Sequence, residues 1–272
     1  MQWERRSLLE RCPPPMASPR SERAPAAPRP ARTPARADAA WRRALTRLTT
    51  PYDPLTSLVL TIPVFLVYHL GILVVDLRNG ADFVTGTVVS LLHTSLVGYV
   101  SLTLAVALAL FAAGSRLRRG HEIDRRALFT VVVESTLWAG LMMIVVGGIV
   151  ARVFDTQLGA LTLGPVSRVV MAAGAGFHEE LFFRVVLFGG GAWLLRHATG
   201  SRTGAELVVA PIAATVFSAA HYVGPYGDTF TLASFVFRLL AGLWFTLVFR
   251  LRGFAVAVYT HALYDLFVFF AR

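Results

Sequence analysis

Lysine is missing from this sequence, so all 26 of its basic residues are arginine. Cysteine occurs once, at Cys12, which excludes an internal disulfide and a metal site built from several thiolates. Charged residues make up only 15% of the chain, whereas a soluble domain carries about 25%. Because 55% of the residues are hydrophobic, the composition argues against a simple soluble globule. The absence of lysine beside abundant alanine, proline and glycine is typical of a GC-rich bacterial genome.

The N-terminal segment, residues 1–50, is rich in proline, arginine and alanine and offers little apolar surface. Such a segment cannot offset its ordering entropy, so we expect a disordered, basic tail. No apolar run long enough for a signal peptide occurs before Leu55. The functional alternative is a basic arm that binds anionic lipid or nucleic acid; the simpler explanation is a solvated tail, or a true start at Met16. We favour a solvated cytoplasmic tail and expect no nucleic-acid partner.

Residues 51–272 are a succession of apolar runs and are expected to form a membrane-embedded domain. A membrane-spanning helix needs about 20 apolar residues. Seven runs come near that length: 55–75, 88–113, 127–150, 165–195, 207–223, 232–249 and 254–271. Since the bilayer offers no water to backbone groups, the sequence predicts an all-α, polytopic membrane helix bundle with about seven transmembrane helices. Gly174, Gly176 and the glycines at 189–191 could break the fourth run, so six to eight helices fit the pattern.

Arginine gathers in alternate loops, which predicts the orientation of the chain. Arg42, Arg43 and Arg47 precede the first run, and further arginines follow the second, fourth and sixth runs. Loops rich in arginine stay on the cytoplasmic side, so we expect the N-terminus in the cytoplasm and the C-terminus outside. The predicted location is the bacterial inner membrane, in contact with membrane lipids.

Charged and histidine side chains interrupt the apolar runs. A charge at the centre of a membrane helix costs at least about 2.5–3.5 kcal/mol, so each one needs a reason. The residues concerned are Glu134, Glu179, Glu180, Arg184, Arg238, Asp265, His69, His93, His178, His221 and His261. Three groups among them, all in the C-terminal half, are candidates for a functional site.

The first group combines Glu179, Glu180 and Arg184. On a helix, Glu180 and Arg184 are four residues apart, share a face and can neutralise each other. Glu179 is turned about 100° away from that face. We therefore expect Glu180 and Arg184 to be structural and Glu179 to be free to react.

The second group is His221, near the end of the fifth run, and the third is His261 with Asp265, four residues apart on one face. Taken singly, each of these residues could be an ordinary packed side chain of the core. Together they place titratable groups in three apolar helices, which makes a functional site the default hypothesis.

The motifs of known intramembrane proteases can be compared with these residues. His178 and Glu179 begin like the zinc motif H-E-x-x-H, but Phe182 stands at the second histidine position. An aspartyl dyad needs two facing aspartates, and only Asp265 is clearly within a run. No serine lies in a G-x-S turn within a run. A carboxylate with two histidines remains, and we expect neither a metal nor a cofactor.

The order and spacing of Glu179-Glu180-x-x-x-Arg184, Phe217-x-x-x-His221 and His261-x-x-x-Asp265 resemble the motifs of the CPBP family. This family includes CAAX prenyl endopeptidases and bacteriocin-processing or immunity proteins. The similarity covers about residues 170–270. It implies a metal-independent intramembrane endopeptidase of the glutamic type, with a peptide or protein substrate that could be lipidated.

The resemblance also implies a role for each residue. Glu179 would activate a water with the help of His221. His261 and the residue at position 265 would stabilise the developing oxyanion, and Arg184 would orient the acidic pair.

Asp265 departs from the prenyl-protease pattern, which typically has asparagine at this position. An ionised carboxylate cannot donate a hydrogen bond to an oxyanion. Asp265 is therefore either protonated or orients His261 from behind.

Three classes of function stay open. We favour a protease, and the first alternative is a non-catalytic immunity or scaffold protein of the same family. The second is a transporter, proton relay or metal site that uses the same buried groups. Transporters commonly show internal repeats, and none is obvious here.

Overall fold

The computed structural model describes residues 51–75, 79–82, 85, 95–117, 126–154, 163–224 and 227–271. These residues belong to one compact unit, Thr46–Arg272. The predicted tail at residues 1–50, His93 and several arginines of the loop that follows the second apolar run lie outside the described residues.

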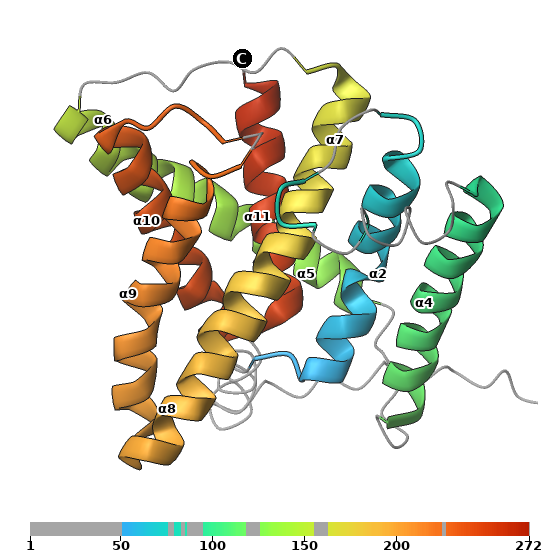
Figure 1. Ribbon diagram of the computed structural model, residues 1–272, viewed down its shortest axis with the longest axis horizontal. Helices are drawn as coiled ribbons and strands as arrows, with labels where there is room; N and C mark the ends of the chain where they lie inside the picture. The colour runs from blue at the N-terminus through green and yellow to red at the C-terminus, as the bar shows by residue number, and fades with distance from the viewer. Residues whose placement is uncertain are drawn as a thin grey trace, which may run out of the picture. The chain divides into compact units, whose positions relative to one another are not determined.

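Among the described residues, the elements form seven helical stretches, and there is no strand. They are α2 (Pro54–Gly71), α4 (Leu96–Leu117), α5, η1 and α6 (Ala127–Met142, Met143–Gly147 and Gly148–Phe154), α7, η2 and α8 (Pro165–Gly174, Ala175–Gly190 and Gly191–Thr199), α9 (Arg202–Ala220), α10 (Leu232–Arg252) and α11 (Phe254–Phe270) (Figure 1). Each stretch overlaps one predicted apolar run, which confirms the all-α bundle.

Five of these stretches are long and apolar enough to cross a membrane: α2, α4, α5 to α6, α9 and α10. The last helix, α11, is apolar but shorter, with 17 residues. The chain therefore has the helices of a polytopic membrane protein. Which end of the bundle faces the cytoplasm stays a prediction from the arginines.

The glycines of the fourth run do not break it. α7, η2 and α8 follow one another as one continuous helix, drawn in yellow in Figure 1. The middle part, η2, has the wider π-type hydrogen bonding, and the helix type changes after Gly174 and after Gly190. Segments of this type are frequent at functional sites, and η2 carries Glu179, Glu180 and Arg184.

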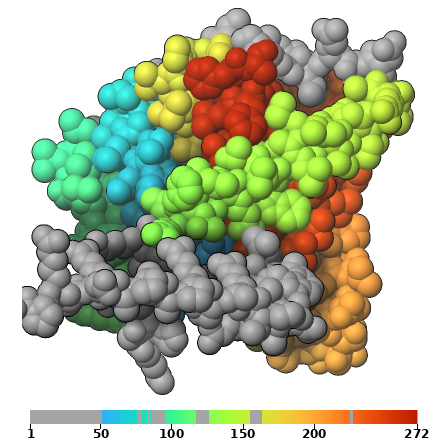
Figure 2. All heavy atoms as spheres, turned by 180° about the vertical axis from the view of Figure 1, so that it is seen from behind, coloured from blue at the N-terminus to red at the C-terminus, as the bar shows by residue number. Residues whose placement is uncertain are grey.

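α11 lies at the centre of the bundle. Residues 255–258 near its start have no exposed surface, and the helix packs against α2, α5, α7, η2 and α10. Figure 2 shows α5 and α6 crossing diagonally over α11 on the back of the bundle. A helix that is apolar on all sides is expected to be buried, and α11 fits that rule apart from the polar residues of the candidate site.

Two of the charges noted in the apolar runs are paired. Glu134 of α5 forms an ion pair with Arg252 at the end of α10, and Arg238 of α10 pairs with Asp228.

Directly after Arg252, a single residue, Gly253, joins α10 to α11. Its φ of 90° lies in the region that favours glycine, so this abrupt connection requires that residue.

η2 and α11 approach each other closely at Gly176. A Cβ atom at this position would lie 2.7 Å from the carbonyl oxygen of Val258 and 2.8 Å from the Cβ atom of Ala262. Small residues at helix crossings let the backbones of membrane helices pack closely. The contact holds η2, with Glu180, against the part of α11 that carries His261.

We predict that Gly176→Leu destabilises the protein by about 1–3 kcal/mol, because the larger side chain overpacks the crossing of η2 and α11. Thermal unfolding of the purified protein in detergent would measure the effect. Gly140→Leu is the matched control, since a Cβ atom at Gly140 of α5 meets no atom within 4 Å. Equal losses in the two variants would show that the crossing at Gly176 does not limit the packing.

Candidate active site

The charge of Arg184 is balanced inside the bundle. Its side chain is only 1% exposed, and its Nη1 lies 3.0 Å from Oε1 of Glu180. Nη2 donates a hydrogen bond of 3.3 Å to the carbonyl oxygen of Gly242 on α10. The guanidinium also lies 4.4 Å from the ring centroid of Phe217 and 5.2 Å from that of Phe245. The ion pair, the hydrogen bond from Nη2 and the two rings balance the charge away from water, although Nη1 has no hydrogen-bond partner among the described residues.

Glu180 also contacts His261 of α11. Nδ1 of His261 lies 2.7 Å from the same Oε1 atom that faces Arg184. A carboxylate between a guanidinium and an imidazole accepts, so Nδ1 carries the proton and donates it. The ring of Phe245 stacks on the imidazole at 4.3 Å. Together these contacts fix the orientation of His261 and leave its Nε2 atom available to the site.

Glu179 is buried, and its two carboxylate oxygens have different surroundings. Oε1 accepts a hydrogen bond of 3.0 Å from Nδ2 of Asn79. Oε2 has no hydrogen-bond partner among the described residues. It faces Nε2 of His221 at 3.7 Å and Nε2 of His261 at 3.9 Å. These distances are too long for direct hydrogen bonds, and a bridging water is the usual explanation of such gaps.

His221 closes α9 and points back towards Glu179. Its Nδ1 lies 2.8 Å from the carbonyl oxygen of Phe217, one helical turn earlier. Since a carbonyl can only accept, Nδ1 donates to it, and Nε2 is the ring nitrogen that faces Glu179. The side chain of His221 is 26% exposed, against 6% for His261. The site is therefore more open on the side of His221.

Asp265 lies beside His261 rather than behind it. Its Oδ2 is 3.8 Å from Nε2 of His261, the nitrogen that also faces Glu179. The other ring nitrogen of His261, Nδ1, donates a hydrogen bond to Glu180. The partner that orients His261 in this geometry is thus Glu180, whereas the i, i+4 spacing alone pointed to Asp265.

The structure thus brings all six predicted site residues together. Glu179, His221, His261 and Asp265 converge, and Glu180 and Arg184 lie behind His261. Among the described residues, no group of three or more His, Cys, Asp and Glu side chains has an arrangement that could hold a metal ion.

A second polar network reaches Glu179 from the segment after α2. Asn79, which donates to Glu179, is itself fixed by a hydrogen bond of 3.0 Å from its backbone N–H to the hydroxyl of Tyr68. That hydroxyl donates to Asp82 at 2.8 Å, and Nε2 of His178 lies 3.6 Å from Asp82. The network was not predicted from the sequence. The signal that could have indicated it is rarity, because Asn79 is the only asparagine of the chain.

Asp82 supplies the negative charge of this network. Burial by itself would raise the pKa of Asp82, but the hydrogen bond from the backbone N–H of Thr85, the nearby imidazole of His178 and the hydroxyl of Tyr68 lower it below its ordinary value. Asp82 is therefore ionised at neutral pH and can accept from Tyr68. His69 extends the network, with its Nδ1 at 2.8 Å from the hydroxyl of Tyr99.

The C-terminal part of the chain, which carries the candidate site, is similar to a known protein family. The family model described as Type II CAAX prenyl endopeptidase Rce1-like matches residues 161–267. The match covers 107 of the 272 residues, so this part of the chain is similar to that family. No curated protein and no solved structure matches the chain. The Rce1-like segment contains all six predicted site residues and confirms the resemblance to the CPBP family, while Asn79 and Asp82 lie outside it.

We predict that Glu180→Gln lowers the free energy of unfolding by about 3–5 kcal/mol, because it leaves the buried Arg184 without its nearest countercharge. Glu179→Gln, the same change one residue earlier, should lower it much less, since Glu179 is not the nearest partner of Arg184. Equilibrium unfolding of the purified variants in mixed detergent would compare them. Equal losses of stability would mean that the two carboxylates share the balancing of Arg184.

Proposed function

We propose that this chain is an intramembrane endopeptidase of the CAAX-protease-like type, in which Glu179 activates a water for attack on a peptide bond. One observation carries the proposal. Oε2 of Glu179 is buried without a hydrogen-bond partner among the described residues, and it faces Nε2 of both His221 and His261. The Rce1-like match supports the class of activity and a peptide or protein substrate at the membrane.

A water in the gap between Glu179 and His221 would donate a hydrogen bond to each of these two residues. One hydrogen would point to Oε2 of Glu179 and the other to the lone pair of His221 Nε2. As the water oxygen attacks the carbonyl carbon, Glu179 takes its proton. When the C–N bond breaks, Glu179 returns that proton to the leaving amine nitrogen, so the carboxylate is regenerated. This is general base and then general acid catalysis by one group, of the kind worth about 10²–10⁴-fold.

His261 would stabilise the oxyanion that forms on the carbonyl oxygen. Its Nδ1–H is committed to Glu180, so Nε2 must also carry a proton in order to donate. Asp265, 3.8 Å from Nε2, favours this doubly protonated ring by its negative charge. Donors fixed in advance at a developing negative charge commonly lower a barrier by about 3–4 kcal/mol. In this scheme Glu180 and Asn79 are positioning residues, because neither faces the reacting atoms.

We predict that Glu179→Gln lowers kcat by at least about 100-fold while the protein stays folded, because an amide cannot accept the proton of the water. The assay is fluorescence release from an internally quenched peptide that ends in a CAAX sequence, prepared with and without a farnesyl group. Asp228→Asn makes the same carboxylate-to-amide change in an exposed loop residue and serves as the control; because it also removes the partner of Arg238, thermal unfolding of both variants accompanies the assay. Unchanged cleavage by the Glu179 variant would refute the proposed base.

The same assay separates this mechanism from one that uses a metal at Glu179, His221 and His261. Activity should persist after dialysis against EDTA and 1,10-phenanthroline. Loss of cleavage that added zinc restores would replace the glutamic mechanism by a metal-dependent one at the same residues.

We further predict that Asn79→Ala lowers kcat by about 10- to 100-fold with little change in KM. A hydrogen bond to a charged group contributes about 1.5–3 kcal/mol, and its loss frees the carboxylate of Glu179 to turn. Steady-state kinetics and thermal unfolding of the variant would test this. A fall in thermal stability with kcat intact would assign Asn79 a purely structural role.

A further inference from the structure

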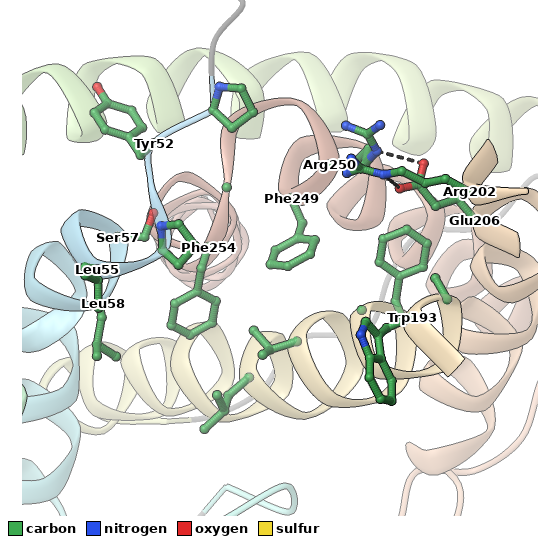
Figure 3. A pocket seen from close by; sticks show the side chains of 18 of the residues that line it. Tyr52, Leu55, Ser57, Leu58, Trp193, Arg202, Glu206, Phe249, Arg250 and Phe254 are labelled. Carbon is green, nitrogen blue, oxygen red and sulfur yellow. Dashed lines mark hydrogen bonds and ion pairs between the residues drawn. The ribbon is translucent and has the colours of Figure 1, made fainter. Parts of the chain in front are cut away.

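A cavity lies away from Glu179, at the end of the bundle where α2 and α9 begin and α8 and α10 end. Its volume is about 640 Å³, within the range of about 300–1,000 Å³ found for small-molecule sites. Most of its wall is apolar (Figure 3): the wall includes Leu55, Leu58, Val185, Phe188, Phe249 and Phe254. An apolar hollow of this size suits a hydrocarbon chain.

Arginines line one side of the cavity. Figure 3 shows Arg202 and Arg250 with Glu206 between them. Oε1 of Glu206 accepts from Nε of Arg202 at 2.9 Å, and Oε2 accepts from Nε of Arg250 at 2.8 Å. Arg196, which also lines the cavity, makes no ion pair among the described residues. Three positive charges therefore face one negative charge, and the rim keeps an excess positive charge.

A buried hydroxyl in the wall is also unsatisfied. Ser57 of α2 has no exposed surface, and its Oγ has no hydrogen-bond partner among the described residues. It belongs to the lining of the cavity. Buried hydroxyls normally have a partner, so Ser57 is an unsatisfied polar group at the end of the cavity away from Arg202 and Arg250 (Figure 3).

We propose that this cavity binds an anionic phospholipid of the membrane, with an acyl chain between the apolar walls and the phosphate group at Arg196 and Arg202. A free phosphate would leave the apolar walls unused, and a neutral lipid would leave the arginines unpaired. Basic pockets between transmembrane helices on the cytoplasmic side bind anionic headgroups in this way. The predicted orientation places the cavity on that side.

The N-terminal tail is a poorer occupant on grounds of charge. Residues 1–50 contain eleven arginines and four acidic residues, so their net charge of +7 would face the positive rim. An anionic lipid, in contrast, complements both the rim and the walls.

Native mass spectrometry of the full-length protein in detergent tests the proposal with two probes, dioleoyl phosphatidylglycerol and dioleoyl phosphatidylcholine. We expect the parent protein to retain phosphatidylglycerol in preference. Arg196→Gln with Arg202→Gln should weaken that binding by about 25-fold, since each basic side chain contributes about fivefold beside an anionic group, or about 1 kcal/mol. Arg250 is left in place because its pairing with Glu206 ties α10 to α9.

Three controls make the outcome decisive. Arg196→Gln alone changes an exposed, unpaired side chain and should cost about fivefold in a fully folded protein. Arg116→Gln removes an exposed arginine of α4 outside the cavity and should leave lipid binding unchanged. Leu55→Trp fills the apolar end and should reduce the binding of phosphatidylglycerol with all arginines present.

Equal retention of the two lipids by the parent, or equal weakening by the Arg116 and Arg196 variants, would overturn the proposal. So would phosphatidylglycerol binding that survives both the paired arginine changes and Leu55→Trp. None of these readouts uses peptide cleavage, so the result is independent of the proposed protease activity.

Discussion

Arg184 places a positive charge in the centre of an apolar bundle, and the candidate site is organised around balancing it. A buried charge without a partner costs several kcal/mol, so Glu180 must remain close to the guanidinium. The oxygen of Glu180 that faces Arg184 also accepts from Nδ1 of His261. One carboxylate oxygen therefore links the stability of the bundle to the orientation of a histidine in the site.

The wider helix of η2 explains how two adjacent carboxylates can both be used inside the bundle. A helix with π-type hydrogen bonding turns less per residue than an α-helix, so Glu179 and Glu180 diverge less than 100°. Glu180 reaches α11, while Glu179 reaches His221 and the segment of Asn79. Three separate parts of the chain thus meet at two neighbouring residues of η2.

The sequence predicted the parts of this structure that depend on local patterns. Apolar runs gave all seven helical stretches, and the cost of buried charge pointed to the residues that converge on Glu179. Spacing within one helix shows which side chains share a face, but it carries no information on contacts between helices. It therefore paired His261 with Asp265 and missed Glu180. Asn79 was missed for the same reason, since it lies 100 residues before Glu179 in a connecting segment without periodicity.

The one-residue connection at Gly253 has a consequence for how the protein is made. With no loop between them, α10 and α11 cannot take up positions in the membrane independently of each other, so they must enter it as a hairpin. The turn of that hairpin is held where Arg252 meets Glu134. Because α11 follows the other described helices in the chain, His261 can reach Glu180 only after those helices have been synthesised.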